Sequence, residues 1–444
     1  MSGRRPAVCI VRHDAYPEDS HVRRDAEALV EAGYDVTVVA LSRAGQAPRD
    51  RVNGVSVYRL PVRHQRGGVL RYVWEYAAFF VLAFVLLAVL HAWKRFQVVE
   101  VDNMPDLLVF CALVPRLAGA RVILFIFDNM PELLTVARGY SPRHPLVGML
   151  RLLERTSARF ADRVIVTQEM ARRLVSSRGV PAHKLATIMN CPDETVFAPP
   201  ASRSSADKPV VGPSRSRPNV WDRPGLGTRP PHAIRAPVFG RVPRTPPGDA
   251  AFVIVTHGLI LERFGIQVLL DALPRIAQVI PHVRLQVIGR GEYRSELERR
   301  ARKNGVADRV EFRDWVPVEE LPELIARANV GYVGMLCDLM LSNKLMEYVA
   351  LQVPAVVSRW PTYQHYFPDD AVTYFRPGDA DDLAAAIVSV WREPETAARR
   401  AACAASLYQR YRWSVQRQTY LDVYASLLRG THEHEVARTA ASLS

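Results

Sequence analysis

Short apolar runs alternate with amphipathic segments along most of the chain, and this alternation starts twice. The first series begins with an apolar run at residues 7–11 and the polar loop RHDAYPEDSH. A helix from Asp19 or Ser20 to Gly33 and a second apolar run at residues 36–41 follow. Strand, loop, helix and strand in this order predict a βαβ unit of a parallel sheet. The pattern therefore restricts the chain to the α/β class, with two Rossmann-like domains.

We predict a first domain at residues 1–198 and a second at 251–430, followed by a loose tail at 431–444. Further strands of the first domain are expected at residues 98–101, 122–127, 164–167 and 186–189, with helices at 107–117, 130–137 and 170–177. In the second domain we expect strands at residues 252–256, 284–288, 310–312, 330–333, 354–358 and 371–375. Helices are expected at 265–280, 292–304, 319–328, 380–391 and 397–428, and a further helix carries Lys344 and Glu347.

Residues 199–250 differ in composition from both series. They hold 12 of the 32 prolines, and eight arginines and one lysine against three aspartates, with almost no apolar run. Such a composition cannot bury enough apolar surface to fold alone, so we expect a disordered basic linker. Because Trp221 and Phe239 stand alone as aromatic residues there, binding of nucleic acid is not expected.

The length of 444 residues allows two sizeable cores. The net charge of +13 points to nucleic acid, an anionic membrane surface or phosphate-bearing ligands. The five cysteines are odd in number and lack any CxxC spacing, which argues against a disulfide framework or a zinc cluster and favours a reducing compartment. The first apolar run is too short for a signal peptide, so we expect a cytoplasmic protein.

The segment at residues 73–93 interrupts the βα pattern. Between Tyr76 and Trp93 it contains no charged residue, and a membrane-spanning helix needs about 20 apolar residues. Aromatic residues at its ends and basic residues on both flanks suit a membrane–water interface. A full span would put the sheet on both sides of the bilayer. We therefore expect a helix lying in or dipping into an anionic membrane face, on the inner side of the cell membrane, with a buried core helix as the alternative.

The run at residues 330–333 leads into a short polar loop and a helix within the stretch CDLMLSNKLMEYVALQVPAVVS. Ser342 or Asn343 is a natural N-cap, and the free N–H groups at a helix start attract phosphate. Lys344 adds a positive charge there, and Glu347 shares its face one turn later. The two residues suit a nucleoside diphosphate whose ribose diol needs an acceptor. An ordinary amphipathic helix with an i,i+3 ion pair is the alternative.

The order of the motifs resembles the retaining GT-B glycosyltransferases of family 4 over residues 7–198 and 251–428. The blocks that carry the resemblance are YPEDSHVRRDAEALVEAGYDV, NMPDLLVFCALVPRLAGARVIL, DNMPELL, HGLILERFG and SNKLMEYVALQVPAVVS. The first two blocks look like those of a bacterial subgroup that acts on cell-surface polysaccharide or glycolipid precursors. The resemblance implies two parallel sheets that face an interdomain cleft, with the ligand at the carboxyl ends of the strands.

In that family the second domain binds a nucleotide-diphosphate sugar as co-substrate, and the resemblance implies no cofactor. Glu347 matches the glutamate that accepts hydrogen bonds from the ribose, and Lys344 lies near the diphosphate. Arg263 matches the cation that steadies the leaving group, a role suited to a guanidinium fork. The other implied donor-binding residues are Ser342, Asn343, Gly258, Gly265, Gly289 and Gly291.

Retention in this family is explained by attack on the front face, with the leaving phosphate accepting the proton of the acceptor. Such chemistry needs stabilisation of charge more than a protein nucleophile. On the first domain, Asp128, Asn129 and Glu132 follow an apolar strand, where the resemblance places groups that meet sugar hydroxyls. The alternative is that Asp128 and Glu132 cap the following helix.

Two positions depart from the family pattern. Phe127 stands where many relatives have a histidine thought to assist at the reacting sugar, and Leu339 stands where many have a second glutamate. His13 and His257, each at the end of a predicted strand, are candidates to supply an imidazole. A satisfied structural histidine is the commoner outcome for such residues.

No metal site is predicted. Asp379 and Asp381 have a DxD spacing but open an alanine-rich helix, where capping is expected, and His432 and His434 lack further ligands. The sequence therefore predicts a metal-independent glycosyltransferase with a lipid-linked or surface-glycan acceptor. A nucleotide-sugar 2-epimerase is one alternative, and Phe127 keeps open a catalytically impaired nucleotide-sugar-binding protein. The donor base and sugar, the acceptor and the oligomeric state are left open.

Overall fold

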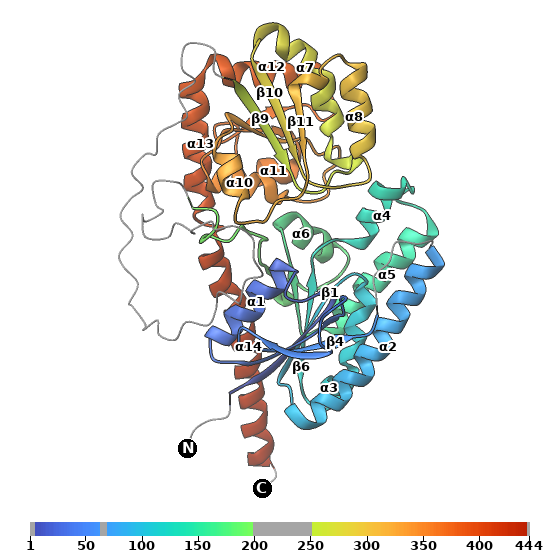
Figure 1. The fold of residues 1–444 in the computed structure, drawn as a ribbon. Helices are drawn as coiled ribbons and strands as arrows, with labels where there is room; N and C mark the ends of the chain where they lie inside the picture. Colours follow the sequence, from blue (N-terminus) through green and yellow to red (C-terminus); the bar gives the residue numbers. More distant parts are fainter. Residues whose placement is uncertain (1–4, 63–68, 199–250, 442–444) are drawn as a thin grey trace.

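The computed structural model describes residues 5–62, 69–198 and 251–441, which form two α/β domains stacked end to end (Figure 1). The first sheet has eight strands in the order β3-β4-β2-β1-β5-β6-β7-β8, and the second has six in the order β11-β10-β9-β12-β13-β14. Neighbouring strands are parallel except for the antiparallel pair β3–β4 at one edge. The predicted fold class is confirmed.

The elements of the first domain are β1 (Ala7–Ala15), α1 (Ser20–Glu31), β2 (Asp35–Leu41), β3 (Arg49–Val52), β4 (Val55–Leu60), α2 (Val69–Lys94), β5 (Val98–Asp102), η1 (Asp106–Ala112), α3 (Leu113–Leu117), β6 (Arg121–Ile126), α4 (Met130–Arg138), α5 (Pro145–Phe160), β7 (Arg163–Val166), α6 (Glu169–Ser177), η2 (Ala182–Lys184) and β8 (Leu185–Thr187).

The elements of the second domain are β9 (Phe252–His257), η4 (Glu262–Phe264), α7 (Ile266–Val279), β10 (Val283–Ile288), α8 (Arg294–Lys303), η5 (Ala307–Arg309), β11 (Val310–Arg313), α9 (Leu321–Ala326), β12 (Val330–Val333), α10 (Asn343–Ala350), β13 (Ala355–Ser358), α11 (Pro361–Tyr366), β14 (Thr373–Phe375), α12 (Ala380–Arg392) and α13 (Pro394–Tyr408). The closing helix α14 (Trp413–Ala441) follows them.

The first βαβ unit forms as its sequence predicts. Asp19 caps α1 by accepting hydrogen bonds from the N–H groups of His21 and Val22. Strand β1 is longer than expected, because it pairs again with β2 at Ala15 after a register shift. Residues 12–15, which we predicted as a loop, thus belong to the strand. The expected helix at 107–117 is instead the 3₁₀ helix η1 followed by the short α3.

Helix α2 covers one face of the first sheet and is apolar on both of its own sides. The buried side contributes Phe79, Ala83, Leu87 and Leu90 to the core. The opposite side exposes large apolar side chains to solvent. We call this side the outer face of α2, and its residues are Val73, Trp74, Val81, Val85, Val89 and Trp93. Trp74 is 71% and Trp93 81% exposed. By length and composition the helix could cross a membrane, but only 28% of its most apolar window is buried in the protein. A fully buried core helix is therefore excluded.

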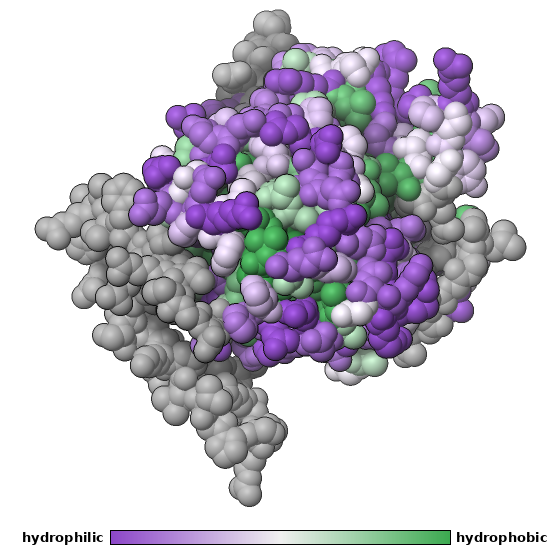
Figure 2. Space-filling model, turned by 90° about the horizontal axis from the view of Figure 1, so that it is seen from above, coloured by the Kyte–Doolittle hydropathy of each residue, from purple (hydrophilic) through white to green (hydrophobic). Residues whose placement is uncertain are grey.

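The outer face of α2 contrasts with the end of the second domain that points away from the first. Seen from above, that end is mostly hydrophilic, with hydrophobic residues in small areas near the centre and towards one side (Figure 2). Large exposed apolar surfaces on a folded domain mark places where something else binds.

The closing helix α14 crosses back to the first domain and runs along it (Figure 1). Tyr420 and Tyr424 are fully buried there against β1, β2 and α1. We expected one helix over residues 397–428 on the second domain and a loose tail beyond it. The structure has two helices, α13 and α14, the second of which packs on the first domain and stays helical to Ala441. The predicted linker at 199–250 lies outside the described residues.

Glu100 on β5 anchors α14. The hydroxyls of Tyr420 and Tyr424 each donate a hydrogen bond to its carboxyl group, at 3.1 Å. Burial raises the pKa of Glu100 well above its usual range, and the neighbouring charges of Asp102 and Asp25 add to the shift. The folded protein therefore holds Glu100 protonated at pH values where the unfolded chain is ionised.

Replacing Glu100 with glutamine, which resembles the protonated acid, is expected to stabilise the fold increasingly as the pH rises. The folded pKa is raised, so the wild-type protein loses stability as the pH climbs from the ordinary glutamate range towards the folded value. Thermal unfolding at pH 5 and pH 9 should show the advantage of Glu100→Gln widening by roughly 3–5 °C. An equal difference at both pH values would contradict the proposed protonation state.

Candidate active site

Helix α10 begins at the cleft side of the second sheet, directly after the loop that follows β12. Ser342 occupies the N-cap, as predicted, but its side chain makes no capping hydrogen bond. Without a side-chain cap, the N–H groups at the start of the helix can meet a ligand, although that of Leu345 bonds the carbonyl oxygen of Ser342 at 3.1 Å. Asn343, the other predicted cap, is instead the first helical residue.

Lys344 is buried beside Gly258 and Phe264. Its ammonium nitrogen lies 4.5 Å from the centroid of the Phe264 ring, a cation–π contact. A Cβ added to Gly258 would lie 3.5 Å from Cε of Lys344, so the lysine packs directly against this glycine loop. Burial lowers the pKa of Lys344 to about 8, against the opposing effect of the Glu347 charge. In the described part of the chain Lys344 makes no salt bridge, so this buried cation is well suited to bind an anion.

Glu347 faces the end of β9. Its Oε2 lies 3.0 Å from Nε2 of His257, and both side chains are largely buried. The predicted i,i+3 ion pair between Lys344 and Glu347 is therefore replaced by a contact with histidine. His257 also packs edge-on against Tyr348, which fixes the plane of its ring. Neither Nε2 of His257 nor Oε2 of Glu347 makes a hydrogen bond within the described residues, so both buried atoms can bond a ligand.

The glycines of the second domain allow its loops to pack closely. A Cβ at Gly289 would lie 1.9 Å from the carbonyl oxygen of Gly258, and one at Gly291 would lie 1.9 Å from that of Ile260. Gly265 has a positive φ of 66°, and a Cβ there would meet the carbonyl oxygen of Gly334. These three glycines therefore have a packing role, which brings the loop at 258–265 to the ends of β9, β10 and β12.

The charge of Arg263 in the second domain acts on Asp128 in the first. Burial raises the pKa of Asp128, and the charges of Arg263 and Arg12 oppose this rise. Nε of Arg263 is buried and makes no hydrogen bond within the described residues. The site thus combines one carboxylate of the first domain with a guanidinium of the second.

Asn129 and Glu132 are tied into the first domain by a polar network. Asn129 donates a hydrogen bond to Glu154 at 3.1 Å, and Arg178 bonds both Glu154 and Glu132. Asn129 holds the N-cap of α4 without a side-chain capping bond. Neither Asp128 nor Glu132 caps this helix, so the capping alternative is wrong.

An interdomain cavity of about 420 Å³ lies next to this network. Asn129, Glu132 and Gln168 line it from the first domain, and Asp338 and Leu339 from the second. At its edge Gln168 bonds the carbonyl oxygen of Leu339 and the N–H of Leu341, which ties the two domains together. The N–H of Glu169 adds a bond to the hydroxyl of Tyr366.

The surroundings of Phe127 contain a guanidinium. The carbon of the Arg12 guanidinium lies 4.4 Å from the centroid of the Phe127 ring, and Nε of Arg12 pairs with Asp19 at 2.9 Å. His21 lies 6.1 Å from the same ring, centroid to centroid. Burial lowers the pKa of His21 to about 4, so it is neutral near pH 7. Neither predicted histidine is recorded at Phe127, since His257 pairs with Glu347 and His13 with Glu75.

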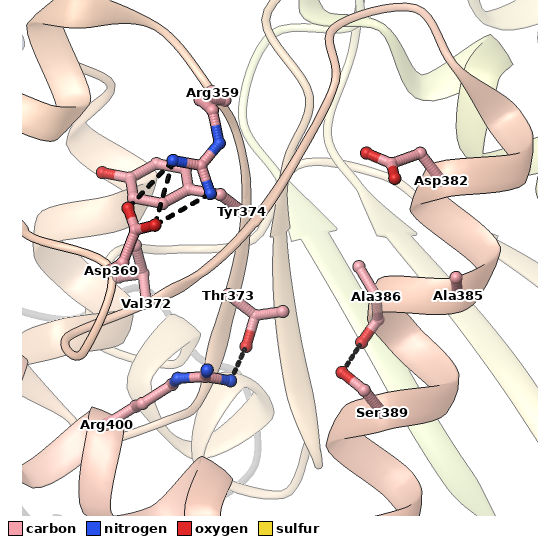
Figure 3. A pocket seen from close by; sticks show the side chains of 10 residues that line it. All are labelled: Arg359, Asp369, Val372, Thr373, Tyr374, Asp382, Ala385, Ala386, Ser389 and Arg400. Carbon is pink, nitrogen blue, oxygen red and sulfur yellow. Dashed lines mark hydrogen bonds and ion pairs between the residues drawn. The ribbon is translucent and has the colours of Figure 1, made fainter.

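Another hollow, of about 320 Å³, lies between β14, α12 and α13 (Figure 3). Arg359 forms three hydrogen bonds with Asp369 there, and Arg400 bonds the hydroxyl of Thr373 (Figure 3). The charge of Arg359 is thus paired, and none of the predicted site residues lines this hollow. Asp379 caps α12 by accepting bonds from the N–H groups of Asp381 and Asp382, which confirms the capping interpretation of the DxD spacing. The side chains of His432 and His434 lie outside the described residues.

Comparison with protein families decides what this two-domain architecture is. Residues 19–191 match the model of a glycosyl transferase 4-like domain, and residues 251–393 match that of the glycosyl transferases group 1. The chain joins a 4-like domain to a group 1 domain. Each match falls on one of the two sheets, so Lys344 and Glu347 belong to the group 1 domain, and Asp128 to the 4-like domain.

A phosphatidyl-myo-inositol mannosyltransferase of Mycobacterium leprae is 28% identical over 176 residues, which are 39% of this chain and 46% of that protein. The chain thus spans less than half the length of the curated relatives it matches. Among solved structures, sucrose-phosphate synthase from Thermosynechococcus elongatus has a TM-score of 0.72 at 17% identity, over 96% of this chain and all of that one. The Anabaena protein HepE in complex with UDP-glucose has a TM-score of 0.65 at 14% identity, over 95% of this chain and 99% of that one. These likenesses confirm the GT-B fold.

Sequence reasoning missed three residues of the site region: Arg12, His21 and Glu75. Arg12 directly follows an apolar run and His21 directly follows a helix start. Side chains at such positions in a parallel sheet point into the cleft, so this signal could have found the first two.

Proposed function

We propose that the protein is a retaining glycosyltransferase that moves a sugar from a nucleotide-diphosphate donor to a lipid-linked or surface-glycan acceptor. The observation that carries the proposal is the buried Lys344 beside Gly258 at the N-terminus of α10, which no side chain caps, with Glu347 and His257 one turn deeper. A diphosphate would neutralise the lysine, and a ribose diol would donate hydrogen bonds to the carboxylate of Glu347.

In the proposed reaction a hydroxyl oxygen of the acceptor bonds to the anomeric carbon on the face that the diphosphate leaves. The bond between that carbon and the phosphate oxygen breaks, and the proton of the hydroxyl passes to the departing phosphate. Arg263 and Lys344 supply positive charge to the diphosphate as its negative charge grows. Asp128 contacts the transferred sugar from the other domain. These steps need no metal ion.

Two observations support a lipid acceptor at the inner face of a membrane. The outer face of α2 is apolar, and the exposed Arg95 follows it with positive charge that would attract anionic lipid, whereas Lys94 pairs with Asp35. The Mycobacterium leprae relative is named for a phosphatidyl-myo-inositol acceptor. We therefore propose a peripheral protein of the cell envelope's cytoplasmic side.

The proposal is tested with the full chain, a panel of nucleotide sugars and liposomes that carry lipid acceptors. A matching donor should raise the unfolding temperature, and transfer should depend on the acceptor. Donor binding without turnover across the panel would instead indicate a nucleotide-sugar-binding protein. Epimerised free donor in the absence of any acceptor would indicate a 2-epimerase.

Donor binding is expected to weaken at alkaline pH because of Lys344. Its pKa in the free protein is about 8, so at pH 9 most molecules must take up a proton before the charged lysine meets the diphosphate. The dissociation constant of the best nucleoside diphosphate, measured by calorimetry, should rise by roughly tenfold between pH 7 and pH 9. The variant Lys344→Met should bind more weakly at pH 7 and show no such pH dependence. A flat profile for the wild-type protein would remove Lys344 from the donor site.

A further inference from the structure

Glu75 is the acidic residue of α2, in a helix that is otherwise apolar through its middle. Its side chain is only 4% exposed, and its Oε1 lies 3.5 Å from Nε2 of His13 at the end of β1. A carboxylate buried in an apolar helix is costly unless a partner compensates it. Phe79 and its apolar neighbours already pack α2 against the sheet. Packing alone therefore does not explain why this polar pair is buried there.

The first turns of α2 also fix the imidazole of His13. The ring lies 4.6 Å from that of Tyr76 and 4.8 Å from that of Phe79, the latter edge-on. Together with Glu75, these two rings give the imidazole three contacts from one helix. A histidine packed in this way is pre-organised for binding, because less rotamer freedom remains to be lost.

The topology places this pair at the mouth of the cleft. A helix that follows a parallel strand starts at the edge where the strands end, and α2 follows β4. Its first turns accordingly lie at the end of the first domain that faces the second domain (Figure 1). The outer face of α2 starts at the same turns, with Val73 and Trp74. Exposed apolar surface therefore begins on α2 beside Glu75, which itself lies on the buried side of the helix with His13.

We infer that Glu75 is a positioning residue for His13, and that His13 holds the polar head of a lipid-linked acceptor where it passes from α2 into the cleft. The inference rests on the proposed function. The donor candidates Lys344 and Glu347 lie on the other domain, so this pair serves the acceptor. A polar pair beside a helix with an apolar outer face suits a molecule that has an apolar tail and a hydroxyl-bearing head. His13 would form a hydrogen bond with that head.

The test is a steady-state comparison of Glu75→Gln with the wild-type protein, using liposomes with the acceptor and varying one substrate at a time. Glutamine keeps the shape of the side chain but removes its charge. The KM for the acceptor should rise at least tenfold, with the KM for the donor changed less than threefold. Glu31→Gln, an exposed glutamate on α1 with 67% of its side chain in solvent, is the matched control and should leave both constants unchanged.

A double-mutant cycle with His13→Gln separates positioning from a purely structural effect. If Glu75 acts through His13, the two substitutions together should raise the KM for the acceptor no more than either alone. An unchanged acceptor KM in Glu75→Gln, or a parallel rise of both KM values, would overturn the inference. If Glu75→Gln does not fold, His13→Gln alone must still raise the acceptor KM selectively. Absence of transfer by the wild-type protein would instead refute the proposed function.

Discussion

Replacing Arg263 with lysine is expected to lower kcat/KM for sugar transfer by about 10²–10³, the usual effect of losing one donor to a developing oxyanion. Nε of Arg263 is buried and has no hydrogen-bond partner among the residues that the structure describes, which is costly unless a ligand uses it. Lysine keeps the charge but lacks the planar fork that contacts two phosphate oxygens at once. Most of the loss should fall on kcat, because the contact strengthens as charge develops on the leaving diphosphate.

Initial rates measured over a range of donor concentrations will separate the two constants. Arg302→Lys is a matched control, since this arginine is exposed on α8 and no function is assigned to it. A loss confined to the KM for the donor would mean that Arg263 binds the ground state only. Full activity in Arg263→Lys would remove it from the site.

Placing charges on the outer face of α2 is expected to release the protein from anionic liposomes. Each apolar side chain that leaves a lipid environment forfeits roughly 1–2 kcal/mol. The double variant Val85→Asp and Val89→Asp should therefore weaken binding by about 10²–10³ in a sedimentation assay. Both valines are more than half exposed, at 54% and 52%, so the fold should tolerate the change.

The control for this variant is Trp315→Asp, which charges an exposed aromatic residue of the second domain, 63% in solvent. It should leave liposome binding unchanged. If the α2 variant still binds liposomes at low salt and high salt abolishes this binding, basic segments of the chain make the membrane contact instead. Transfer to a soluble acceptor analogue should survive in the α2 variant, because the cleft is untouched.

Much of the fold could be predicted from the sequence because buried parallel strands are continuous apolar runs. The hairpin β3–β4 escaped because Arg49–Val52 is polar and exposed at the sheet edge. Helix α5 escaped because the residues it buries include Glu154 and Ser157, which do not form an apolar stripe. The docking of α14 could not be inferred at all, since periodicity identifies a buried face but not its partner.

The part of the site whose residues lie close together in the sequence could be predicted. Lys344 and Glu347 lie one turn apart on α10, so helical spacing alone brought them together. The contacts of Glu347 with His257 and of His13 with Glu75 join residues far apart in the chain, which only the fold brings together. Gly289 and Gly291 were expected to bind the donor. In the structure they allow the neighbouring loops to pack closely, because a Cβ at either position would meet a backbone carbonyl oxygen.

Because α14 returns to the first domain, it links the two domains through non-covalent contacts as well as through the chain. A chain cut anywhere within residues 199–250 would give two fragments, and the later fragment would still carry the helix whose tyrosines grip Glu100 of the earlier one. The contacts of α14 would thus hold the two fragments together without an intact chain through residues 199–250. The molecule is suited to assembly from separately made pieces, and to circular permutation with new ends in that segment.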